Sequence, residues 1–115
     1  MIENLNFAVK GNNYSIKFPN IGEFKTIEVM KQALSNGVYD GLIKTNTSSA
    51  QYASEMIEME AFLSVLCPKL IEELYGNISF RNLGIKDYLE LAKAYKSQVS
   101  PWWDEILKMV SGQED

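Results

Sequence analysis

The chain has 115 residues, of which 46% are hydrophobic and 23% are charged, and it carries a net charge of −4. A chain of this size and composition is typical of one globular domain, so we expect a single domain over residues 1–115 rather than a disordered chain. Histidine is absent and Cys67 is the only cysteine, so the commonest general base and metal ligand is missing and no internal disulfide can form. We therefore expect a protein that is not an enzyme and that uses no cofactor and no metal.

The charge is unevenly distributed along the chain. Residues 1–46 contain five Lys and four acidic residues, and residues 47–115 contain six Lys or Arg and eleven acidic residues, so the two net charges are +1 and −5. A nucleic-acid-binding domain normally shows a basic stripe, and none is present. The chain also has neither a run of roughly 20 apolar residues nor a signal-peptide pattern at its N-terminus. We expect a cytoplasmic protein that contacts neither nucleic acid nor membrane.

Residues 1–20 predict a β-hairpin. Apolar and polar side chains alternate on both sides of the turn cluster Gly11-Asn12-Asn13. The alternating apolar residues are Leu5, Phe7 and Val9 before the turn and Tyr14, Ile16 and Phe18 after it. This period of two gives each strand one apolar face, so the hairpin should cover a core on one side. Pro19 cannot donate to a strand ladder and ends the second strand.

Residues 21–110 predict a helical body, and residues 111–115 a frayed tail. Apolar residues at three- and four-residue spacing predict helices over residues 23–34, 50–67, 69–75, 85–98 and 101–110. The inner face of the first helix should carry Phe24, Ile27, Leu34 and either Met30 or Lys31. Ser35-Asn36-Gly37 should end that helix. Residues 38–43 are compatible with a third strand or with an irregular link.

Two further helical features follow from the pattern. In the helix over residues 50–67, one apolar stripe should contain Tyr52, Met56, Met59, Leu63 and Leu66. Ser100-Pro101 is typical of a helix start, with serine as the cap and proline at the first helical position. The expected fold is α+β, mainly α, with an N-terminal β-hairpin packed on a compact bundle of about four to five helices.

A few residues are candidates for chemistry. Carboxylates such as Glu55, Glu58 and Glu72 could act as an acid and a base or bind a metal, but a solvated helix face explains them as well. Cys67 follows apolar residues and is better explained as a small buried hydrophobe than as a nucleophile. Met30, Met56 and Met59 could line an adaptable groove or could be plain core.

The pair Trp102-Trp103 is the strongest indication of a protein partner. Adjacent helical residues lie about 100° apart, so one ring should anchor the core while the other lies at its edge or meets a partner. The alternative is that both rings are buried. The candidate partner-binding residues are Trp102, Trp103, Ile106, Met109 and Val110.

The segment Gly11-Asn12-Asn13-Tyr14-Ser15-Ile16-Lys17-Phe18-Pro19-Asn20-Ile21-Gly22-Glu23-Phe24, followed by a helix and Ala33-Leu34-Ser35-Asn36-Gly37, resembles small proteins of tailed bacteriophages. The chain resembles phage tail assembly chaperones, in which a hairpin precedes a compact helical body. The resemblance covers about the first 45 residues and the helical remainder. It implies a non-enzymatic protein of the host cytoplasm that binds the tape-measure or tail-tube protein and can self-associate.

Three functions therefore stay open. The first is a protein-binding assembly factor, a phage tail assembly chaperone. The second is a minor structural subunit of a phage particle or of another homo-oligomer, in which the hairpin edge pairs between copies. The third is a small enzyme that uses carboxylates such as Glu55, Glu58 or Glu72.

Overall fold

A computed structural model of the chain describes residues 4–112. The chain divides into two compact units, one formed by Met1–Phe18 with Arg81–Asp115 and the other by Pro19–Phe80. The hairpin thus belongs with the C-terminal helices, whereas the sequence pattern grouped all helices into one body. The predicted fold class, α+β and mainly α with an N-terminal hairpin, is confirmed.

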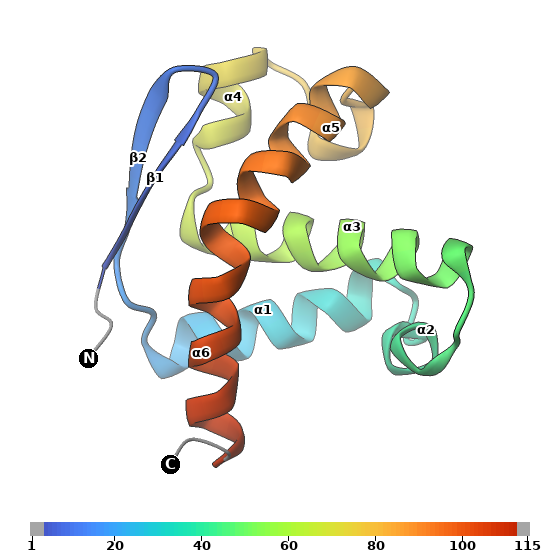
Figure 1. Cartoon of the computed structure of the whole chain (residues 1–115). Coiled ribbons are helices and arrows are strands. Elements are labelled where there is room, and N and C mark those ends of the chain that lie inside the picture. Colours follow the sequence, from blue (N-terminus) through green and yellow to red (C-terminus); the bar gives the residue numbers. More distant parts are fainter. Residues whose placement is uncertain (1–3, 113–115) are drawn as a thin grey trace. The chain divides into compact units, whose positions relative to one another are not determined.

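The hairpin of the first unit pairs β1, Leu5–Val9, with β2, Asn12–Ile16, in antiparallel register (Figure 1). Val9 lies opposite Asn12, so the turn consists of Lys10 and Gly11 alone. Both have positive φ, 53° and 77°, which is the backbone conformation that a tight two-residue hairpin turn requires. The turn predicted at residues 11–13 is therefore wrong by one position, because Asn12 and Asn13 pair with β1.

The hairpin has the two-faced character that its period of two predicts. Phe7, Val9 and Ile16 are buried, while residues between them are more exposed. β1 lies against the C-terminal helices of the same unit. Beyond β2, the ring of Phe18 meets the indole of Trp102 edge-on, with ring centroids 6.4 Å apart.

The C-terminal part of the first unit is a helical rod that changes its winding in the middle. It comprises α5, Ile85–Ala94, the π-helical segment η2, Tyr95–Val99, and α6, Ser100–Ser111 (Figure 1). α6 begins at Ser100 with Pro101 in its first turn, as predicted, but the predicted serine cap is wrong, because the Ser100 side chain caps nothing and its N–H donates to the Tyr95 carbonyl. Pro101 has no N–H, and its ring would crowd the carbonyl four residues earlier in a regular helix. The wider π turn lets the helix continue through Pro101.

The second unit consists of helices with clear end signals. They are α1, Ile21–Leu34, α2, Tyr39–Lys44, α3, Ser48–Leu66, and α4, Leu70–Tyr75, and a short 3-10 helix η1, Phe80–Asn82, follows. Asn20 and Glu23 form a reciprocal capping box at the start of α1, with N···O distances of 2.8 and 2.9 Å. At its end the Gly37 N–H reaches the Gln32 carbonyl at 2.7 Å, and Asn36 and Gly37 have positive φ. The predicted stop is confirmed as a Schellman motif.

Residues 38–43 are neither a strand nor an irregular link, because α2 occupies Tyr39–Lys44. Val38 and Tyr39 favour strands locally, and Gly41 weakens a helix. Tyr39 is nevertheless buried against side chains of the neighbouring helices. This tertiary contact decides the conformation.

The predicted apolar stripe of α3 is wrong at its N-terminal end. Tyr52 and Met56 are exposed, by 60% and 41%, while Ala50 and Ser54 face inward. Met59 and Leu63 are buried as predicted. Short side chains let neighbouring helices approach closely at this end, so hydropathy alone identifies the wrong face.

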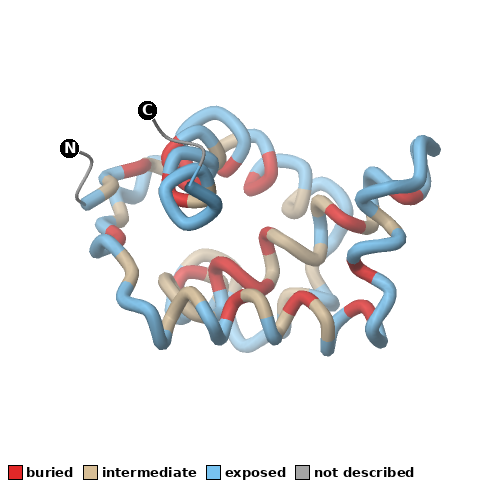
Figure 2. The backbone as a smooth tube through the Cα atoms, turned by 90° about the horizontal axis from the view of Figure 1, so that it is seen from below, coloured by how far each residue is buried: buried red, intermediate tan, exposed pale blue. Residues whose placement is uncertain are grey.

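Burial follows the helical repeat in both units. Figure 2 shows buried positions separated by exposed ones along the longer helices. Within residues 4–112, no helix has both the length and the apolar character needed to cross a bilayer. Of the predicted tail, Ser111 ends α6 and Gly112 caps it with φ 76°, while residues 113–115 lie outside the described part of the chain.

Replacing the α1 cap tests the role of local end signals. We expect Asn20→Ala to lower the free energy of unfolding by about 1 kcal/mol, because the Glu23 main-chain N–H loses its side-chain acceptor. Urea unfolding followed by circular dichroism measures this loss. Asn46→Ala is the matched control, since Thr47 caps α3 in its place. Equal losses in both variants would contradict the capping role.

Candidate functional site

The five residues predicted to bind a partner fall into two groups. Trp102, Trp103 and Ile106 are buried. Of the two alternatives for the tryptophans, the structure thus has the one in which both indole rings are buried. Met109 and Val110 are exposed near the end of α6. In this conformation only these last two are available to another molecule.

A different pair of apolar side chains is also exposed, on α5. Ile85 and Leu89 lie one turn apart on α5, and 77% and 58% of their surfaces are accessible. Leu91, Ala92 and Tyr95 form the buried face of the same rod. The sequence contains the signal as two apolar residues one helical turn apart, but two such residues alone do not distinguish a surface from a core.

A buried polar cluster joins three helices of the second unit. Lys31 of α1 is only 6% exposed. Its ammonium lies 2.8 Å from the Glu28 carboxylate and 4.9 Å from the centre of the Tyr39 ring. The ion pair and the cation–π contact offset part of the cost of burying the charge. Of the two alternatives left open for the inner face of α1, the structure places Lys31 deeper than Met30.

Tyr39 connects this cluster to α3. Its hydroxyl donates to a carboxylate oxygen of Glu58 over a long distance of 3.4 Å. Burial, together with the charge of Glu58, raises the pKa of Tyr39 well above the usual range for tyrosine. Glu58 therefore takes part in the contact that joins α3 to α2.

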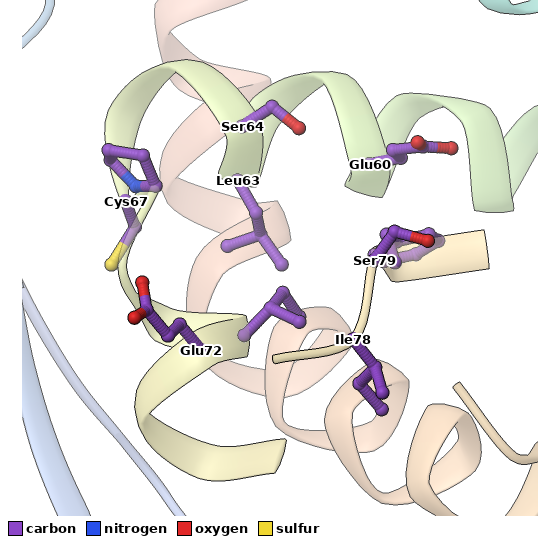
Figure 3. A pocket seen from close by; sticks show the side chains of 10 residues that line it. Glu60, Leu63, Ser64, Cys67, Glu72, Ile78 and Ser79 are labelled. Carbon is purple, nitrogen blue, oxygen red and sulfur yellow. The ribbon is translucent and has the colours of Figure 1, made fainter. Parts of the chain in front are cut away.

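A hollow of the second unit is lined in part by Cys67. It has a volume of about 290 Å³ and lies between the end of α3, α4 and residues 78–80. Cys67 and Glu72 lie at one end and Glu60 and Ser79 at the other, with Leu63 between them (Figure 3). Burial, assisted by the charge of Glu73, raises the pKa of the Cys67 thiol. The thiol is thus biased away from the reactive thiolate, as expected for a structural cysteine.

The candidate carboxylates do not converge. Within residues 4–112, no three Asp, Glu or Cys side chains are arranged so that they could hold a metal ion. Glu55 accepts a hydrogen bond from Gln51 at 3.1 Å on the same helix, and Glu72 is exposed. The sequence predicted that these acids lie on solvated helix faces. Glu58 differs, because it accepts a hydrogen bond from the Tyr39 hydroxyl.

Comparison with protein-family models, curated proteins and solved structures found no match for this chain.

The raised pKa of Tyr39 should appear in alkaline stability. Because the folded chain holds this proton more tightly than the unfolded chain, its contribution to stability is complete below about pH 10 and is lost as the pH rises further. We expect Tyr39→Phe to reduce the alkaline slope of the free energy of unfolding by at most about 1.4 kcal/mol per pH unit. Urea midpoints measured from about pH 8 to about pH 11 test this. Tyr52→Phe, at an exposed site, should leave the slope unchanged.

The Cys67 thiol should react slowly with an aromatic disulfide reagent. We expect a rate about tenfold below that of free cysteine at the same pH, because the thiolate is the reactive form. Glu73→Gln should increase the rate by removing a nearby negative charge, whereas Glu90→Gln, in the other unit, should not. A native rate equal to the rate in urea would contradict this account.

Proposed function

We propose that the chain is a protein-binding assembly factor that contacts its partner through an apolar face of α5. The observation that carries this proposal is the exposure of Ile85 and Leu89 on consecutive turns of one helix. Side chains four residues apart lie next to each other on a helix surface. Exposed apolar neighbours of this kind are typical of protein interaction sites.

The energetics favour a helical or grooved apolar partner. Fully burying two such side chains contributes about 1.5–3 kcal/mol each. Lys86, Glu90 and Lys93 are exposed beside these two residues on α5, so the surrounding charges are of both signs. An amphipathic helix of the partner, with charged residues of both signs beside its apolar ones, fits this surface.

The resemblance to phage tail assembly chaperones suggests the identity of the partner. It supports a tape-measure or tail-tube protein, met in the host cytoplasm during tail assembly. The order of a β-hairpin followed by helices agrees with that resemblance. A minor structural subunit of the particle is the second candidate, favoured by the open outer edge of β2 described below.

Binding by matched surface variants tests the proposal. The chain is co-expressed with a phage tape-measure protein and with a tail-tube protein, and affinities are then measured by calorimetry. We expect Ile85→Ser combined with Leu89→Ser to weaken the complex at least about tenfold, that is by about 1.4 kcal/mol or more. Val29→Ser combined with Ile43→Ser is the control, because both positions are similarly exposed in the other unit.

Three outcomes would contradict the proposal. They are the absence of any complex with either protein, equal weakening in both double variants, and no weakening in the α5 variant. Presence of the chain in purified mature particles would favour the structural subunit over the chaperone.

A further inference from the structure

The register of the hairpin determines which main-chain groups face outward. Phe7 lies opposite Tyr14 and Val9 opposite Asn12, and these directly paired residues bond across the hairpin. The residues between them belong to non-bonded pairs, Asn6 with Ser15 and Ala8 with Asn13. Their N–H and C=O groups point away from the partner strand. Each strand therefore has one outer edge.

The outer edge of β1 is closed at Ala8 by a side chain. The Ala8 N–H donates to Oε1 of Gln98, and Nε2 of Gln98 donates to the Ala8 carbonyl, both at 2.8 Å. A carboxamide presents one acceptor and one donor in the same plane, as a neighbouring strand would. Gln98 lies in the π-helical segment η2, which contacts β1.

The outer edge of β2 is open. Asn13 and Ser15 are exposed, and within residues 4–112 no hydrogen bond reaches their outward main-chain groups. β2 is the strand of the hairpin farther from the helical rod, because β1 is the strand in contact with α5 and η2 (Figure 1). An edge of this kind is a template for another strand.

We propose that the outer edge of β2 pairs, antiparallel and about a twofold axis, with the same edge of a second copy of this chain. With the axis at Tyr14, Asn13 of each copy lies opposite Ser15 of the other. Each of these residues then gives one N–H and one C=O to the new ladder. The two hairpins form one continuous sheet.

The charges along the strand are compatible with a second copy of the chain as the pairing strand. In this register Lys17 lies opposite Gly11 of the second copy and Lys10 opposite Phe18, so no like charges meet. A strand carrying basic residues at those places would meet Lys10 or Lys17. Gln98 occupies the outward main-chain groups of Ala8, so on β1 only Asn6 keeps outward groups for a further strand. One residue is too few for a strand ladder, so the assembly stops at two copies rather than growing into a fibre.

Charge variants test the pairing without disturbing the fold, because both positions are exposed. The mass in solution is measured by sedimentation equilibrium at concentrations about a hundredfold apart. We expect wild type to shift from one to two chains. Asn13→Lys with Ser15→Lys, and Asn13→Glu with Ser15→Glu, should each stay monomeric, because like charges oppose across the axis. An equimolar mixture of these two variants should regain the two-chain mass.

Removing the edge closure tests the role of Gln98. We expect Gln98→Ala to form species larger than two chains at the higher concentration, while Gln51→Ala, which loses a side-chain hydrogen bond on α3, should behave as wild type. A wild type that stays monomeric at both concentrations overturns the proposal, and so does a lysine variant that dimerises as well as wild type. A Gln98→Ala variant that stops at two chains overturns the role assigned to Gln98.

Discussion

The paired hydrogen bonds between the Gln98 carboxamide and the main chain of Ala8 join segments that lie 90 residues apart. An isolated two-stranded hairpin is marginally stable in water, so β1 and β2 depend on the helices beside them. The π-helical segment adds a residue to the turn that carries Gln98 and also accommodates Pro101. The π-helical segment thus continues the helix through Pro101, holds the hairpin against the rod and places Gln98 on the outer edge of β1 at Ala8. This explains why the two ends of the chain form one unit.

The second unit depends on a buried charge instead. Lys31 is held by Glu28 and by the face of Tyr39, and Tyr39 in turn reaches Glu58. Such contacts add little net stability, because desolvation offsets most of the electrostatic gain. The residues in these contacts nevertheless come from α1, α2 and α3, so the three helices must pack in one arrangement for all of the contacts to form. The cluster therefore specifies the packing of short helices whose apolar faces are small.

The sequence predicted those elements that local chemistry determines. The period of two in the hairpin, the Asn36-Gly37 stop and the proline and glycine boundaries were sufficient for both strands and for most helices. The errors share another cause. Residues 38–43 became helical through the burial of Tyr39, and the inward face of α3 is set by neighbouring helices rather than by hydropathy. The buried tryptophans and the Gln98 contact also depend on residues distant in the chain, which no local pattern reveals.

The two proposed surfaces lie on the same unit and use different residues. Ile85 and Leu89 are exposed on α5, while strand pairing involves Asn13 and Ser15 on the outer edge of β2. Occupation of one surface leaves the side chains of the other accessible. A pair of chains would then present two α5 faces joined by one continuous sheet. Two weak apolar contacts linked in this way bind a long helical partner far more tightly than one contact alone, because the second binding event is intramolecular. If both proposed contacts form, modest exposure on each chain is sufficient for a stable complex.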